Sequence, residues 1–84
     1  MRSFLLMGTS GCHLCDQAAE IIIVTMDPQL HQVEEVDIAF EDGLMEKYAV
    51  QIPVLVDEQS GAELGWPFDQ HQLQDFISAV SVSS

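Results

Sequence analysis

Residues 8–15 read Gly-Thr-Ser-Gly-Cys-His-Leu-Cys and contain both cysteines of the chain, Cys12 and Cys15. A short apolar run from Phe4 to Met7 precedes this stretch, and an apolar-rich segment from Leu14 to Met26 follows it. The pattern predicts a buried strand, then a glycine-containing turn, then a helix that begins at or next to Cys12. The two cysteines would therefore lie at the junction between the first strand and the first helix.

This position favours chemistry at the Cys12 sulfur. A thiol at a helix N-terminus faces unpaired backbone N–H groups and the positive end of the helix dipole, and both favour the thiolate. Cys15, one turn along the same side, could attack a disulfide formed at Cys12. His13 could stabilise the thiolate by charge or hydrogen bonding, or it could be an ordinary exposed helix residue. The pair in this setting predicts a reactive dithiol.

The composition indicates one globular domain over residues 1–84. A chain of 84 residues, 48% of them hydrophobic, can form one small core and has no room for a second domain. Two cysteines are too few for a disulfide scaffold, so we expect reactive or metal-binding thiols in the reducing cytoplasm. The N-terminal apolar run is shorter than the roughly 7–15 residues of a signal peptide, so we do not expect export.

The charge of the chain limits its partners. Fourteen acidic residues stand against only two basic ones, Arg2 and Lys47, which gives a formal net charge of −12. Nucleic acids and anionic membranes are bound through Lys and Arg, so we expect neither as a partner. No segment approaches the roughly 18 apolar residues of a membrane span. The acidity either keeps the protein soluble or selects among partners by charge.

The segment that follows the cysteines gives conflicting signals. Residues 21–25 read Ile-Ile-Ile-Val-Thr, and such a β-branched run by propensity alone favours a strand. We assign it to the helix, because a strand that began at Ile21 would leave the helix barely two turns. Asp27 and Pro28 would then end the helix near Met26.

The remaining segments complete an α/β pattern. We expect the first strand at 3–7, the helix at 12–26, an edge strand at 32–38, a short helix at 42–49, a hairpin of strands 54–56 and 62–66, and a last helix from the N-cap Asp69 to about Val80. Residues 81–84 would form a flexible tail. The order is βαβ-α-ββ-α, in which the first two strands are parallel and joined by a right-handed crossover.

Several parts of the sequence together resemble the glutaredoxin branch of the thioredoxin superfamily, and most of all the small bacterial glutaredoxin-like proteins with a Gly-Cys-x-Leu-Cys-Asp motif. These parts are residues 11–16, which carry that motif, Val36 to Ile38, Tyr48, Ile52 to Leu55, and Trp66 to Asp69. The resemblance covers about residues 3–80. It implies a thioredoxin-like fold in which three helices pack on a four-stranded mixed sheet of order 2-1-3-4.

The resemblance also implies roles for individual residues. Cys12 would be the attacking thiol and Cys15 the resolving thiol, supported by Pro53; the supporting role of His13 rests only on its position beside Cys12. Pro53 would follow a cis peptide bond beside Cys12. Gly11, Ile52 and Pro53 would contact the substrate, with Ile52 offering its backbone. We therefore predict an enzyme that carries out thiol–disulfide exchange without a bound cofactor. We expect protein or small-molecule disulfides as substrates, a dithiol as reductant, and a monomer.

The sequence departs from the pattern of glutathione-using glutaredoxins. Many of these carry a Lys or Arg just before the thiol motif and another near the second helix. Here Thr9, Ser10 and Gly11 precede Cys12, and Lys47 is the only basic residue near the second position. Pro67 replaces part of a Gly-Gly pair and cannot donate a backbone N–H. We therefore expect glutathione to be a poor partner.

A second function remains open from the sequence: an interaction module that keeps the thioredoxin fold, with redox-inactive or metal-binding cysteines. Structural zinc usually requires four protein ligands, and His31 and His71 are isolated along the chain. We therefore predict no metal site. Retention of a metal, or a cysteine pair that does not exchange, would favour the interaction module.

Overall fold

The computed structural model describes residues 2–82, without the side chains of Ser81 and Val82. Its elements are β1 (Arg2–Gly8), α1 (His13–Thr25), β2 (His31–Asp37), a 3-10 helix η1 (Ile38–Phe40), α2 (Asp42–Tyr48), β3 (Val54–Asp57), β4 (Glu63–Gly65) and α3 (Gln70–Val82).

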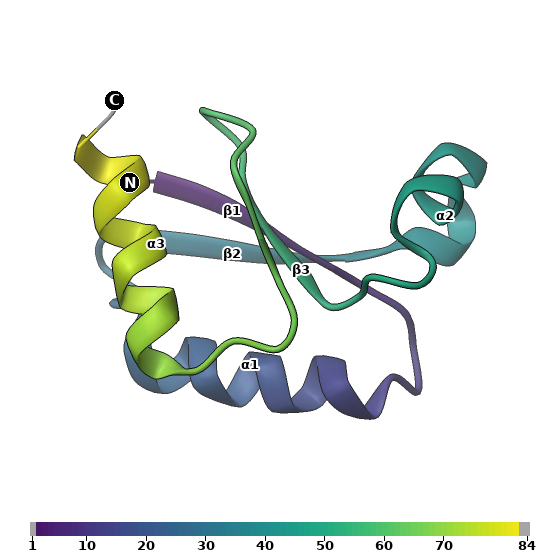
Figure 1. Ribbon diagram of the computed structural model, residues 1–84, viewed down its shortest axis with the longest axis horizontal. Coiled ribbons are helices and arrows are strands. Elements are labelled where there is room, and N and C mark those ends of the chain that lie inside the picture. Colours follow the sequence, from purple (N-terminus) through teal and green to yellow (C-terminus); the bar gives the residue numbers. More distant parts are fainter. Residues whose placement is uncertain (1, 83–84) are drawn as a thin grey trace.

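The strands form one mixed sheet in the order β2-β1-β3-β4. β1 is parallel to β2 and antiparallel to β3, and β3 pairs antiparallel with β4 in a hairpin. α1 and α3 lie together on one side of the sheet, and α2 lies apart from them near the other end of the molecule (Figure 1). This is the predicted thioredoxin-like fold, with the predicted strand order and three α-helices.

Two apolar clusters hold the helices to the sheet, one on each face. Side chains of β1 and β3 that point to one face pack with α1 and α3 around Phe4, Leu6, Ala18, Ile22, Leu55 and Leu73. The alternate residues point to the other face and pack with η1 and α2 around Met7, Ile38, Tyr48 and Val54. The alternation follows from the two-residue period of a strand.

The β-branched run 21–25 is helical, as we predicted. Ala18, Ile22 and Met26 recur every four residues and are buried, whereas Ile23 and Val24 are 75% and 69% exposed. One face of the helix thus supplies the core, and the burial of Ile22 outweighs the weak helix propensity of its neighbours.

Most element boundaries differ from the prediction by one residue, and the differences at the ends of β2 and α3 also change the segments that follow them. β2 ends at Asp37 because the side chain of that residue accepts a hydrogen bond from the N–H of Ala39 at 2.9 Å and caps η1, which the sequence analysis did not predict. α3 continues through Val82, so the predicted flexible tail does not begin at Ser81. The rest of that tail, residues 83–84, lies outside the described residues.

A buried ion pair joins the start of β1 to the end of β3. Arg2 donates from Nε and Nη2 to the two carboxylate oxygens of Asp57, at 2.9 and 2.8 Å. Asp57 is fully buried, and Ser60 also donates to it from its backbone N–H and its hydroxyl. Burial alone would favour the neutral acid, but the hydrogen bonds from Arg2 and Ser60 outweigh burial and lower the pKa of Asp57 to about 2.

Between Arg2 and Val82, no helix combines the length and the apolar character needed to cross a membrane.

Candidate functional site

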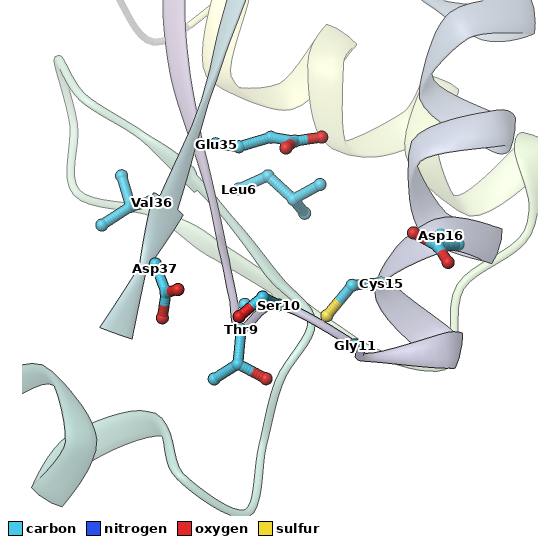
Figure 2. Close-up of a pocket in the computed structure, with 10 residues that line it drawn as sticks. Leu6, Thr9, Ser10, Gly11, Cys15, Asp16, Glu35, Val36 and Asp37 are labelled. Carbon is cyan, nitrogen blue, oxygen red and sulfur yellow. The ribbon is translucent and has the colours of Figure 1, made fainter. Parts of the chain in front are cut away.

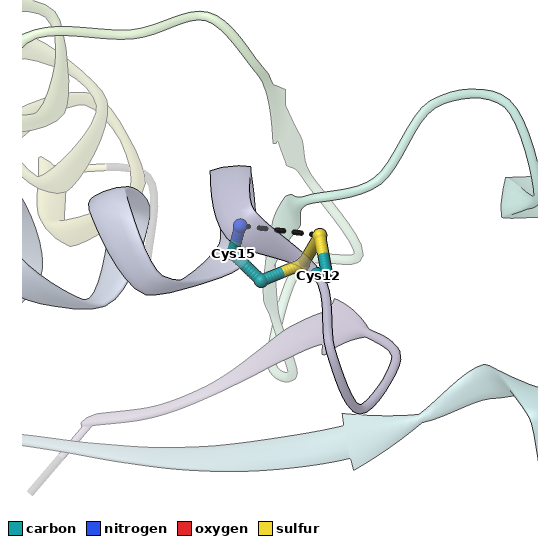
Figure 3. The surroundings of a disulfide bond; sticks show 2 residues. All are labelled: Cys12 and Cys15. Carbon is teal, nitrogen blue, oxygen red and sulfur yellow. Dashed lines mark hydrogen bonds between the residues drawn. A yellow bond between two sulfur atoms is a disulfide. The ribbon is translucent and has the colours of Figure 1, made fainter.

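The two cysteines meet at the N-terminus of α1, where they form a disulfide (Figure 3). Cys12 is the N-cap of the helix, and Cys15 lies within its first turn with a Cα atom 5.2 Å from that of Cys12. The backbone N–H of Cys15 donates a hydrogen bond to Sγ of Cys12 at 3.2 Å. An otherwise unpaired N–H of the first turn is therefore aimed at this sulfur.

The turn before the disulfide depends on a glycine. Gly11 has a φ of +75°, a left-handed conformation that costs glycine little and other residues more. The preceding part of the turn is closed by a hydrogen bond from the N–H of Cys12 to the carbonyl of Thr9, at 3.4 Å. This turn lets the chain leave β1 and enter α1 with Cys12 at the cap.

A second glycine, Gly8, allows the sheet to approach the disulfide. A Cβ atom on Gly8 would lie 2.7 Å from Sγ of Cys15, which is closer than non-bonded carbon and sulfur atoms approach each other. The sequence pattern predicts Gly8 only as part of the turn after the first strand and does not reveal this close approach. A glycine at the end of a predicted buried strand was the available signal, because such a glycine often marks a close approach.

A cleft of about 300 Å³ opens beside the disulfide, between the β1–α1 turn and the end of β2 (Figure 2). Its lining residues are Leu6, Gly8, Thr9, Ser10, Gly11, Cys15, Asp16, Glu35, Val36 and Asp37. Figure 2 shows the side chains of Glu35 and Asp37 leaving β2 on the side where Leu6 and Cys15 lie. One sulfur of the disulfide therefore borders a cleft that contains three carboxylates.

Both basic residues of the chain have partners away from this cleft. Arg2 is paired with Asp57, and Nζ of Lys47 lies 3.2 Å from a carboxylate oxygen of Glu63 and 5.0 Å from the ring centroid of Tyr48. The buried Tyr48 hydroxyl also donates to Glu63, and this hydrogen bond is the main cause of the lowered pKa of Glu63. Lys47 thus belongs to a small network that ties α2 to β4.

Another part of the predicted site is the segment before β3 that carries Ile52 and Pro53. The bonds Ile52–Pro53 and Trp66–Pro67 are both cis, and Pro53 is buried. Val54, which follows Pro53, pairs with Met7, so the start of β3 lies beside the end of β1 that carries Gly8. This places Pro53 and the disulfide at the same end of the sheet.

The structure shows fewer available contacts at Ile52 and His13 than their predicted roles require. The N–H of Ile52 already donates to the carbonyl of Tyr48 at 3.2 Å, which leaves its carbonyl oxygen as the backbone group that could contact a substrate. His13 is exposed at the first position of α1, and its ring has no hydrogen-bond or ion-pair partner among the described residues. The roles assigned to these two residues stay predictions.

Within residues 2–82, no three His, Cys, Asp or Glu side chains are grouped closely enough to hold a metal ion. The cleft carboxylates come from separate elements and line a space rather than converge on a point.

Comparisons with known proteins agree with the fold. The family model of the glutaredoxin-like domain (DUF836) matches residues 3–78. The crystal structure of protein XcR50 from X. campestris has 34% sequence identity and a TM-score of 0.80, over 90% of this chain and 96% of that one. The solution structure of XcR50 gives a TM-score of 0.77, also at 34% identity, over 94% and 95% of the two chains.

Protein Ne2328 from Nitrosomonas europaea is 24% identical with a TM-score of 0.76, over 89% of each chain, and shares the fold. No curated protein matches the sequence. The cysteine pair, spaced as Cys-x-x-Cys at the N-terminus of α1, fits a redox role. Because the family model spans nearly all of the described residues, the chain belongs to the glutaredoxin-like family.

Proposed function

We propose that the protein is a thiol–disulfide oxidoreductase that works through Cys12 and Cys15. One observation carries the proposal: the sulfur of Cys12 caps α1 and accepts the N–H of Cys15 at 3.2 Å. In the reduced protein, the same N–H and the helix dipole would stabilise a thiolate at Cys12. The thiolate is the form that attacks a disulfide.

The reaction that we propose has two steps. The Cys12 thiolate attacks one sulfur of a substrate disulfide, forms a mixed disulfide and expels the other substrate half as a thiolate. Cys15 then loses its proton to solvent and attacks the Cys12 sulfur, which releases the second half as a thiolate. The substrate gains two electrons, and the protein is left with the Cys12–Cys15 disulfide described above.

The expected partners follow from this chemistry. Substrates would be protein or small-molecule disulfides, and an external dithiol would reduce the protein and complete the cycle. The reaction uses no bound cofactor. We expect a monomer in the reducing cytoplasm, where a dithiol of this kind remains available.

The test uses each cysteine variant as the control for the other. Reduced Cys15→Ser, mixed with excess 2-hydroxyethyl disulfide, should retain a mixed disulfide at Cys12 that intact-mass spectrometry detects. Reduced Cys12→Ser should retain far less under the same conditions. Equal labelling of the two variants would contradict the assignment of Cys12 as the attacking thiol. A reduced wild-type protein that reacts no faster than a free dithiol would contradict the enzyme proposal and favour the interaction module.

A further inference from the structure

Resting on the proposed function, we propose that the cleft beside Cys15 binds a positively charged group of the substrate. The group would be an ammonium or guanidinium a few bonds from the substrate disulfide. The protein would accordingly react faster with cationic disulfides than with neutral or anionic ones of the same size.

The carboxylates that line the cleft beside the disulfide come from two elements, α1 and β2. Glu35 and Asp37 pair with Leu6 and Gly8 of β1, and these alternate residues share the face of the sheet that α1 covers. Asp16 adds a carboxylate from the first turn of α1. Thr9 and Ser10 complete the rim with hydroxyl groups, which can donate to a carboxylate or accept from an ammonium.

The negative charge of the cleft is not neutralised locally. None of its lining residues is basic, and Arg2 and Lys47 are paired elsewhere with Asp57 and Glu63. Within the described residues, the side chains of Asp16 and Glu35 have no hydrogen-bond or ion-pair partner. A concave surface lined by one sign of charge concentrates ligands of the opposite sign.

The cleft adjoins the turn that carries Cys12, although Cys12 itself is not among its lining residues. It includes Gly11, directly before Cys12, and Cys15, whose Cα atom is 5.2 Å from that of Cys12. In a mixed disulfide at Cys12, an ammonium two carbons from the substrate sulfur could extend along this wall. A substrate carboxylate at the same place would be repelled by the carboxylates of Asp16, Glu35 and Asp37.

The test is a single-turnover oxidation of the reduced full-length protein, which needs no added reductant. The probes are cystamine, 2-hydroxyethyl disulfide and 3,3′-dithiodipropionate, which carry cationic, neutral and anionic ends on similar short chains. Acid quenching, alkylation and mass spectrometry measure the loss of protein thiols with time. Each rate is divided by that of a free dithiol with the same probe, which removes the probes' own differences in reactivity.

Two variants distinguish a rate preference caused by the cleft from one caused by the net charge of the whole protein. Glu35→Gln removes a carboxylate that lines the cleft, whereas Glu34→Gln removes an exposed neighbour on β2 that points to the other face. Both change the net charge equally. We expect Glu35→Gln to lower the cystamine-to-neutral rate ratio by about two- to fivefold at low salt, and Glu34→Gln to change it much less. The effect should shrink as salt is raised.

A second pair of probes distinguishes the source of the cation. These are symmetrical disulfides of short peptides that carry Lys or Glu beside the cysteine. A preference for the Lys peptide without one for cystamine would indicate a protein substrate, and a preference for cystamine alone would indicate a small aminothiol disulfide. Either result supports the cation site.

If the ratios are equal in wild type, Glu35→Gln and Glu34→Gln for both pairs of probes, cystamine against 2-hydroxyethyl disulfide and the Lys peptide against the Glu peptide, the cation site is overturned and the oxidoreductase stays intact. An equal fall of the ratio in both variants would also overturn it, because the preference would then come from the overall charge. Failure of every probe to oxidise the protein faster than the free dithiol would instead overturn the proposed function.

Discussion

The backbone N–H of Cys15 points at the sulfur of Cys12 and donates a hydrogen bond to it over 3.2 Å. Once the disulfide is reduced, this donor and the helix dipole should favour a thiolate at Cys12. The carboxylate of Asp16 in the same turn opposes this effect, so we expect a modest one. Cys12 should ionise below the value of about 8.5 for a free cysteine.

The rate of alkylation against pH measures this ionisation. Cys15→Ser is used so that Cys12 is the only thiol, with Cys12→Ser as the matched comparison for Cys15. A Cys12 midpoint at or above 8.5 would show that the helix N-terminus does not activate the thiol.

Gly8 is needed because Sγ of Cys15 lies where its side chain would begin. In Gly8→Ala the new Cβ would lie 2.7 Å from that sulfur, so α1 and β1 must move apart. We expect a loss of about 1–3 kcal/mol in the free energy of unfolding of the oxidised protein, typical of overpacking. Urea unfolding monitored by circular dichroism measures it. Gly43→Ala in α2 is the control, since no atom lies within 4 Å of its added Cβ and alanine favours the helix.

The Arg2–Asp57 pair should make stability depend on acid pH. The pKa of Asp57 is about 2 in the folded protein, and in the unfolded chain it returns to the ordinary value of about 3.9. A group whose pKa is lower in the folded state stabilises that state above the unfolded pKa. This difference corresponds to roughly 2.5 kcal/mol, fully present at neutral pH and mostly lost as pH falls from about 5 to 2.

Urea unfolding at several pH values between 2 and 7 measures this contribution. Asp57→Asn should be destabilised at pH 7, because Arg2 loses its carboxylate, and should depend less on pH between 5 and 2. Glu58→Gln, at the exposed adjacent position, should follow the wild-type curve closely. Parallel wild-type and Asp57→Asn curves over this range would contradict the assignment.

The sequence predicts the fold well because its strongest signals are local. Glycine and proline positions mark the turns, and apolar spacing marks the buried faces of α1 and α3. The β-branched run 21–25 is the one segment where propensity and context disagree. Context prevails there because Ile22 can be buried only if α1 continues.

Apart from η1, which is capped locally by Asp37, the features that sequence reasoning missed depend on distant contacts. Arg2 and Asp57 are 55 residues apart, and Asp57 was assigned to a turn rather than to the core. The cleft combines α1 with the end of β2, and its charge depends on the parallel register that places Glu35 beside Leu6. Lys47 is predicted as the only basic residue near the second helix, but its contact with Glu63 exists only because α2 packs beside β4. Such contacts between distant residues are set by the three-dimensional fold and leave no local signal in the sequence.

Glutathione should be a poor reductant for this protein, because neither basic residue, Arg2 or Lys47, is available beside the disulfide to bind its carboxylates. Lys47 is already paired with Glu63 and Tyr48, and the cleft beside Cys15 contributes three carboxylates of its own. Each missing charge-assisted hydrogen bond is worth about 1.5–3 kcal/mol, so the loss of two lowers affinity by two or more powers of ten. Turnover of 2-hydroxyethyl disulfide with glutathione should therefore be weak beside turnover with a dithiol.

Ser10→Lys, which places a cation on the exposed rim of the cleft, should raise the glutathione rate about two- to fivefold at low salt, whereas the neutral control Ser10→Gln should not. Robust wild-type turnover with glutathione that salt does not change would mean that backbone groups bind the tripeptide without cations.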